Sequence, residues 1–431
     1  MVIPSGLRVS MKSAWKPIKK EAAGMETSSM EKTEAIIREG KRALLSLSHG
    51  VQATAEWNHV SGLLEHYDVD VITNKAPGEI RSVLFLLTRM VRFAGGQTSI
   101  LRIGTELVKL GLQVGYGVYK SQSKEEMALC ATSNLEEYQG ELYTKQDIVR
   151  MVKHPKEQPD VVIASSWDTV HYVKKFNSYR MYFVQDFEPY FYPFGDKFLM
   201  AKKTYEQGLH MVSLGDWNKK EVEKHCRPAS PIDCVEFPCE RKEYPHVERD
   251  YEAYAEKKKL VMAVYLKYYG KRLPNTIQYM LGKVKETFEQ RDGITLDIRY
   301  FGEAKSFVPK NGTNVGMLNK EELRQLYTEA DFGMVASLSN ISLIPYEMLA
   351  TGLPLIEFED GTFREFFPED CAILTSLSWK DLYRQMKDCL EEPVRLQLYD
   401  ANATDYLSTL SWEKSGQQFY EILSQVQEQT E

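Results

Sequence analysis

Residues 339–356 read Ser339-Asn340-Ile341-Ser342-Leu343-Ile344-Pro345-Tyr346-Glu347-Met348-Leu349-Ala350-Thr351-Gly352-Leu353-Pro354-Leu355-Ile356, and this stretch lies between two apolar runs. Pro345 suits the first turn of a helix, where its missing N–H costs nothing, and Gly352 suits the end of one. The apolar residues 332–336 before it and 355–358 after it have the length of buried strands. The stretch therefore predicts a strand, a loop, a short helix and a second strand.

A helix in such a unit begins at the carboxyl end of a parallel sheet, where its free N–H groups and its dipole favour a phosphate. We expect Ser342, Leu343 and Ile344 to lie at this helix start and to face the phosphates of a nucleotide. Glu347 comes one turn inside, where its carboxylate can accept hydrogen bonds from a ribose hydroxyl. The alternative is that Glu347 only stabilises the start of the helix.

The residues Pro345, Glu347, Gly352 and Pro354 resemble the donor-nucleotide motif of GT-B glycosyltransferases, in the large retaining family that includes many bacterial polysaccharide enzymes. The usual motif has two glutamates separated by seven residues, and Ser339 stands where the first would fall. The resemblance implies an α/β protein with two Rossmann-like domains whose parallel sheets face each other across a cleft. It carries over no role for the first glutamate, which usually contacts the donor sugar.

The length and composition fit this architecture. A chain of 431 residues is too long for one hydrophobic core and fits two domains with an extension. Its net charge of -7 argues against a dedicated nucleic-acid binder. The six cysteines form no CxxC pair, which fits a reducing cytoplasm and argues against a zinc site. No run approaches the roughly 18 apolar residues that span a bilayer. We expect a cytoplasmic protein, at the inner face of the membrane if it attaches there peripherally.

Residues 1–78 form an N-terminal extension of different character. The composition of residues 1–30 predicts a disordered or loose arm, and the apolar spacing of residues 31–47 predicts a helix. Asp68 and Asp70 match the Asp-x-Asp metal motif of the other large glycosyltransferase fold. No nucleotide-binding strand and helix precede them, so we favour a solvated strand edge over a metal site.

The N-terminal domain is expected over residues 79–238. Residues 83–87 and 112–119 read as strands on either side of a helix at 100–110, and the loop before that helix contains Gly95, Gly96, Gln97 and Thr98. Glycines there let the backbone approach a ligand, and Thr98 or Ser99 can cap the helix. A tight turn without a ligand is the alternative. The resemblance favours a ligand, because the first loop of GT-B enzymes faces the cleft.

Two acids follow a later strand of the same domain. Residues 161–164 and 182–184 read as buried strands, and Asp186 and Glu188 come just past the second among several aromatic residues. Rings that pack on a pyranose and carboxylates that bind its hydroxyls would make a sugar platform. The alternative is an aromatic corner between a strand and a loop.

The stretch from Tyr182 to Pro193, with residues 204–208, is similar to the bacterial rhamnosyltransferases of the WsaF type, which build surface glycans from dTDP-β-L-rhamnose. This resemblance implies that Asp186 and Glu188 belong to the catalytic cleft. By position we expect Asp186 to contact the transferred sugar or the incoming hydroxyl, and Glu188 to support the loop. An acid within hydrogen-bond reach of the acceptor could take its proton.

The C-terminal, donor-binding domain is expected over residues 239–411 and begins with a charged linker. The strand at residues 260–265 is followed by Lys267, Lys271 and Arg272, which would neutralise a diphosphate, and Gly302 follows the strand at 296–301. A solvated basic turn is the alternative. The resemblance implies that a last helix, about residues 412–431, returns to the N-terminal domain.

The resemblance as a whole implies transfer of L-rhamnose from dTDP-β-L-rhamnose to a growing glycan with retention of anomeric configuration. No metal and no cofactor beyond the donor is expected, because basic side chains and a helix start would hold the diphosphate. The partners would be the donor and a glycan acceptor, free or lipid-linked, with no nucleic acid; a homodimer is left open. One alternative is a UDP-linked sugar donor, and another is a non-catalytic partner subunit of the same fold.

Overall fold

The computed structural model describes residues 50–75, 77–268 and 270–428. The chain divides into two compact units, residues 1–67 and 68–431. In the described part of the first unit, residues 50–64 form a helix. The loose arm predicted at residues 1–30 and the helix predicted at residues 31–47 lie outside the described residues.

The second unit contains two parallel sheets, each at the centre of one domain, and both domains belong to this unit. The sheet of the first domain has seven strands in the order β3-β2-β1-β4-β5-β6-β7. Each neighbouring pair runs parallel. Its strands are β1 (Ser82–Leu87), β2 (Gln113–Val118), β3 (Glu141–Tyr143), β4 (Val161–Ala164), β5 (Tyr179–Val184), β6 (His210–Leu214) and β7 (Ile232–Val235). The helices that connect them are α3 (Gly95–Lys109), α4 (Lys124–Asn134), α5 (Lys145–Lys153), α6 (Trp167–Val173), α7 (Asp196–Thr204) and α8 (Asp216–His225), with short 3-10 turns η1 (Pro155–Glu157) and η2 (Glu188–Phe191).

The second sheet has six parallel strands in the order β10-β9-β8-β11-β12-β13. They are β8 (Lys259–Tyr265), β9 (Thr295–Phe301), β10 (Thr313–Gly316), β11 (Phe332–Met334), β12 (Leu355–Phe358) and β13 (Ile373–Thr375). The helices of this domain are α9 (Pro274–Thr287), α10 (Lys320–Glu329), α11 (Leu343–Ala350), α12 (Trp379–Glu391) and α13 (Val394–Ser408). Shorter turns are η3 (Glu252–Glu256), η4 (Gly270–Arg272), the π-helical η5 (Phe288–Asp292) and η6 (Phe363–Glu365).

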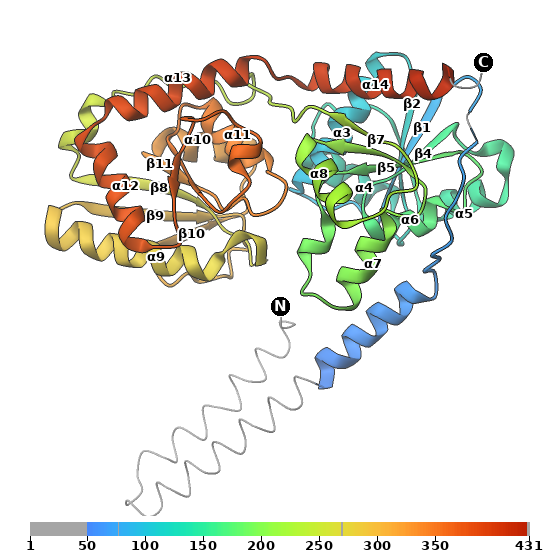
Figure 1. Cartoon of the computed structure of the whole chain (residues 1–431), viewed down its shortest axis with the longest axis horizontal. Coiled ribbons are helices and arrows are strands. Elements are labelled where there is room, and N and C mark those ends of the chain that lie inside the picture. The colour runs from blue at the N-terminus through green and yellow to red at the C-terminus, as the bar shows by residue number, and fades with distance from the viewer. Residues whose placement is uncertain (1–49, 76, 269, 429–431) are drawn as a thin grey trace, which may run out of the picture. The chain divides into compact units, whose positions relative to one another are not determined.

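The last helix, α14 (Trp412–Glu428), packs against α3 of the first domain (Figure 1). Gly416 allows this close packing, since a Cβ there would lie 2.3 Å from Cβ of Glu106. Phe419 is buried, and its ring centroid lies 6.2 Å from that of Phe85 and 5.7 Å from that of Phe183. The end of the chain thus completes the hydrophobic core of the first domain.

The strands have the character predicted from their sequence. The last five residues of β1 and all of β4 are buried, as in a sheet with helices on both faces. The apolar run at 332–336 is shorter as a strand than expected, because β11 ends at Met334 and the chain then turns into the loop before α11.

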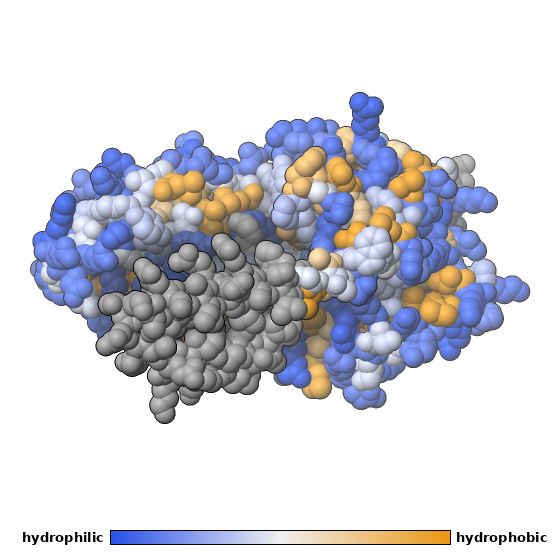
Figure 2. All heavy atoms as spheres, turned by 90° about the horizontal axis from the view of Figure 1, so that it is seen from below, coloured by the Kyte–Doolittle hydropathy of each residue, from blue (hydrophilic) through white to orange (hydrophobic). Residues whose placement is uncertain are grey.

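The segment before β1 lies on the first domain as an irregular stretch. Asp68, predicted at a solvated strand edge, accepts a hydrogen bond from the Asp70 amide, and its carboxylate lies 3.0 Å from Lys174 Nζ. Among the described residues, no helix is both long enough and apolar enough to cross a bilayer. Figure 2 shows that hydrophobic residues on one face form separate patches among hydrophilic ones.

Candidate functional site

A pocket lies where the carboxyl ends of β8 and β9 meet the start of α11. Its walls come from the second domain, from the linker around Cys239 and Tyr244, and from the first turns of α3 in the first domain. The site residues predicted from the sequence that line it are Gly95, Thr98, Lys267, Gly302, Ser342, Leu343, Ile344 and Glu347. Side chains far apart in the sequence therefore share one cavity.

Helix α11 presents its amino end to this pocket. Ser342 occupies the N-cap position in an extended conformation, and its side chain makes no capping hydrogen bond. Within the described part of the chain, the buried Ser342 hydroxyl has no hydrogen-bond partner. The first N–H groups of an α-helix also lack intrahelical partners. The helix ends at Ala350, and Gly352, which follows the C-cap Thr351, has a φ of +69° that glycine adopts without strain. The predicted helix start and stop are both present.

Glu347 projects from α11 into the pocket. The Tyr327 hydroxyl donates a hydrogen bond of 3.3 Å to its carboxylate. Burial raises the pKa of Glu347 to about 7, while hydrogen bonds from Tyr327 and Tyr244 favour its ionised form. Glu347 therefore has acceptor capacity toward the pocket that a ligand hydroxyl can satisfy.

The predicted cations separate in the structure. Lys267 lines the pocket, with its ammonium 5.8 Å from the Tyr265 ring centroid. Lys271 instead forms an ion pair with Asp186 of the first domain. Arg272 is buried and donates a 2.9 Å hydrogen bond to the Ala336 carbonyl. Of the three, Lys267 is the one placed to meet a diphosphate in this pocket.

An ion network in the wall of the pocket was not foreseen from the sequence. Glu243 of the linker accepts hydrogen bonds from Arg102 of α3 and from Lys320 of α10, the latter at 2.6 Å. Arg102 also lies 3.6 Å from Glu240 and stacks over the Trp412 ring at 5.3 Å. The network joins both domains and the linker through charges that come from three separate segments, α3, the linker and α10. The sequence indicated only that the linker is charged, and it did not predict which residues its acids would pair with.

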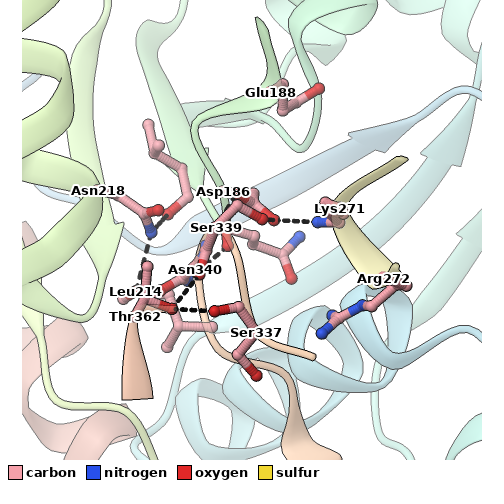
Figure 3. A network of polar contacts seen from close by, with 12 residues as sticks. Asp186, Glu188, Leu214, Asn218, Lys271, Arg272, Ser337, Ser339, Asn340 and Thr362 are labelled. Carbon is pink, nitrogen blue, oxygen red and sulfur yellow. Dashed lines mark hydrogen bonds and ion pairs between the residues drawn. The ribbon is translucent and has the colours of Figure 1, made fainter. Parts of the chain in front are cut away.

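Asp186 crosses from the first domain to the second. Its carboxylate accepts hydrogen bonds from Lys271 Nζ, from Ser339 Oγ at 3.1 Å and from the Asn340 amide at 3.1 Å (Figure 3). Asp186 is only 7 % exposed. Burial lowers the pKa of the Lys271 ammonium, whereas the nearby charge of Asp186 opposes that change. The serine at position 339 thus touches an acid supplied by the other domain.

No family model matches this chain. Its structure superposes on Anabaena Alr3699/HepE in complex with UDP and glucose with a TM-score of 0.63 and 12% identity, covering 80% of this chain and 100% of the other. It superposes on WaaG, a glycosyltransferase involved in lipopolysaccharide biosynthesis, with a TM-score of 0.54 and 15% identity over 79% of this chain and 99% of that one. The fold is the GT-B fold.

A curated relative is similar in sequence over part of the chain. The O-antigen biosynthesis protein RfbC of Myxococcus xanthus is 23% identical over 281 residues, which are 62% of this chain and 21% of that protein. The chain thus spans about a fifth of the length of the relative that it matches. The predicted α/β class with two Rossmann-like domains is confirmed by the sheets and by the GT-B structures.

The glycine loop of this GT-B protein differs from the prediction. Gly95 and Gly96 lie in the first turn of α3 and not in a loop before a helix at residue 100, and the N-cap is Ala94. The capping role expected for Thr98 or Ser99 is therefore wrong. Gln97 accepts a hydrogen bond from the Val91 amide and donates one to the Arg89 carbonyl. Its amide thus holds the preceding loop, while Gly95 and Thr98 face the pocket.

Glu188 lies inside the first GT-B domain, apart from the Asp186 contact (Figure 3). Its carboxylate accepts a 2.6 Å hydrogen bond from the Tyr182 hydroxyl and bonds of 3.1 and 3.2 Å from the Trp167 amide. Burial raises its pKa to about 8. The Tyr205 hydroxyl accepts from the Glu188 amide and donates to the Asp186 carbonyl, 3.0 Å each. Glu188 thereby fixes the corner that carries Asp186.

Proposed function

We propose that this GT-B protein is a glycosyltransferase that moves L-rhamnose from dTDP-β-L-rhamnose to a growing cell-surface polysaccharide with retention. The observation that carries the proposal is the pocket, which gathers Lys267, the start of α11 and Glu347 at the carboxyl ends of parallel strands. Ligands bind to open α/β sheets at such strand ends. A cation, a row of N–H donors and a carboxylate are what a nucleoside diphosphate requires.

Each pocket group has a chemical part in this proposal. The helix N–H groups that follow Ser342 donate to diphosphate oxygens, and Lys267 supplies the positive charge. Glu347 accepts a hydrogen bond from the 3′-hydroxyl of the deoxyribose. These groups stabilise the charge that develops on the leaving diphosphate, so the reaction needs no cation beyond those of the protein.

The transfer breaks the bond between the anomeric carbon and the diphosphate oxygen and forms a bond from that carbon to the acceptor oxygen. The acceptor proton leaves with the nucleoside diphosphate. Asp186 lies between the domains, and we assign it the role of orienting the acceptor hydroxyl. Both Asp186 oxygens already accept hydrogen bonds from the second domain, which fixes their place.

The choice of donor rests on sequence resemblance, and the solved structures favour a second candidate. The stretch from Tyr182 to Pro193 resembles enzymes that use dTDP-β-L-rhamnose, and RfbC, named for O-antigen biosynthesis, supports a polysaccharide acceptor. Anabaena HepE is described in complex with UDP-glucose. A UDP-linked sugar is therefore the alternative donor.

Titration of the protein with dTDP, UDP and thymidine, followed by mass detection of products from dTDP-rhamnose and UDP-glucose, tests the proposal. We expect dTDP to bind more tightly than UDP, and rhamnose to be transferred or released. Tighter binding of UDP together with turnover of UDP-glucose would show that the donor is a UDP-linked sugar and not dTDP-rhamnose. Nucleotide binding without hydrolysis or transfer would support a non-catalytic partner subunit.

A further inference from the structure

A buried acid of the second domain has no part in the proposed chemistry. Glu357 of β12 is 0 % exposed, and its two oxygens accept hydrogen bonds from the Ser337 amide at 3.0 Å and the Ser337 hydroxyl at 2.7 Å. Burial raises its pKa to about 7. A buried carboxylate is costly unless it is satisfied by donors. Both carboxylate oxygens of Glu357 bind Ser337, the first residue of the segment 337–340, so Glu357 anchors that segment.

Thr362 holds the same segment from the next loop. Its amide donates a 2.7 Å hydrogen bond to the Ser337 carbonyl. Its hydroxyl lies 2.5 Å from the Ser339 carbonyl and 3.2 Å from that of Ser337, and its single proton serves the shorter contact. Gly361 allows this approach, since a Cβ there would lie 2.6 Å from the Ser337 carbonyl oxygen.

The segment held in this way carries the donors to Asp186. Ser339 Oγ and the Asn340 amide each lie 3.1 Å from a different carboxylate oxygen of Asp186 (Figure 3). We infer that Thr362 and Glu357 are positioning residues, which fix Ser339 and Asn340 so that Asp186 is held at one place for sugar transfer. The inference rests on the proposed function for its catalytic consequence, although the contacts themselves do not.

Other contacts keep the domains together when Thr362 is changed. The Asn340 side chain donates hydrogen bonds to the Gln185 carbonyl at 2.6 Å and the Leu214 carbonyl at 3.1 Å. A Cβ on Gly215 would lie 2.9 Å from the Phe366 ring, so these residues pack closely across the same interface. Loss of the Thr362 hydroxyl should therefore alter the placement of Asp186 without separating the domains.

Thr362→Val removes the hydroxyl and keeps the shape of the side chain, and Thr362→Ser restores the hydroxyl. Thr287→Val is a matched control, since that hydroxyl bonds only the Lys283 carbonyl within α9 in the described contacts. We expect Thr362→Val to speed hydrogen exchange at the Asn340 amide and to lower turnover about tenfold, the equivalent of one hydrogen bond. The affinity for dTDP should stay unchanged, and the serine variant should restore both properties.

Combining Thr362→Val with Asp186→Asn distinguishes an effect of Thr362 on the placement of Asp186 from an effect on the stability of the whole protein. If Thr362 acts through Asp186, Thr362→Val causes no further loss of turnover in the Asp186→Asn protein. A full additional loss there, or unchanged exchange at Asn340 in Thr362→Val, would overturn the inference. Glu357→Gln gives a second variant, with the same expectation for exchange. A protein that binds no nucleotide would refute the proposed function, while exchange at Asn340 still decides the positioning.

Discussion

Replacing Asp186 by asparagine should destabilise the contact between the domains, because it strands a buried cation. Asp186 binds Lys271 Nζ with side-chain exposures of 10% and 18%. In Asp186→Asn the amide can still accept from Asn340, and Ser339 Oγ can rotate to accept from the new NH₂ group. Lys271 alone loses its counter-ion. Breaking a buried pair costs about 3–5 kcal/mol, and the remaining exposure of Lys271 puts the expected loss near 2–3 kcal/mol.

The double variant Asp186→Asn/Lys271→Met isolates that cost. Methionine keeps contact with the Phe191 ring, over which the Lys271 ammonium lies at 4.0 Å, and removes the stranded charge. The double variant should therefore regain about half of the stability lost in Asp186→Asn. Urea unfolding of the four proteins of this cycle, followed by fluorescence, measures the coupling between the two positions.

An exposed ion pair across the same interface supplies the control. Lys220 Nζ lies 3.3 Å from Glu365, and both side chains are about half exposed, at 59% and 48%. The cycle Lys220→Met with Glu365→Gln should give a coupling of less than about 1 kcal/mol. Additive losses in the Asp186–Lys271 cycle, or equal couplings in the two cycles, would show that Asp186→Asn strands no buried charge.

Three further predictions concern the pocket and the buried acids. Glu347→Ala should weaken dTDP binding by about 1.5–3 kcal/mol through loss of a charged acceptor, and unchanged affinity by calorimetry in a folded variant would remove it from the site. Lys267→Gln should weaken the binding of dTDP much more than that of thymidine, which carries no phosphate. Lys283→Gln, outside this pocket, should change neither affinity. Equal losses of affinity for both ligands would indicate a structural role for Lys267. Because the folded pKa of Glu188, about 8, lies above its ordinary 4.5, its stabilising contribution is present below pH 4.5 and is lost as the pH rises through 8. Glu188→Gln should therefore gain stability relative to wild type between pH 5 and 8, by at most about 1.4 kcal/mol per pH unit, and parallel pH profiles of melting temperature would contradict this.

Short-range patterns predicted most of the elements. The helix of residues 343–350 follows from Pro345 and Gly352, and the buried strands follow from apolar runs, because both signals are local. The start of α3 was missed because glycine disfavours helix interiors, and here Gly95 and Gly96 occupy the first turn. A Cβ at Gly96 would lie 3.3 Å from the side-chain oxygen of Gln185, which leaves room for little side chain, whereas a Cβ at Gly95 would meet no atom within 4 Å beside the pocket.

The placement of side chains could not be read from such patterns. Lys267, Lys271 and Arg272 lie within six positions, yet they point to the pocket, to Asp186 and to the Ala336 carbonyl. Lys271 and Arg272 lie in the η4 turn, and the left-handed Leu273, with φ of 44°, follows it. Asp186 meets residues more than 150 positions away. Only tertiary packing determines contacts of this kind, and the sequence gives no periodic signal for them.

A crystal structure of the protein with dTDP would show whether the pocket at the start of α11 is the nucleotide site. We expect the diphosphate between Lys267 and the first N–H groups of α11, with the deoxyribose hydroxyl within hydrogen-bond distance of Glu347. A nucleotide bound elsewhere on the protein, or an empty pocket at saturating dTDP and UDP, would contradict it.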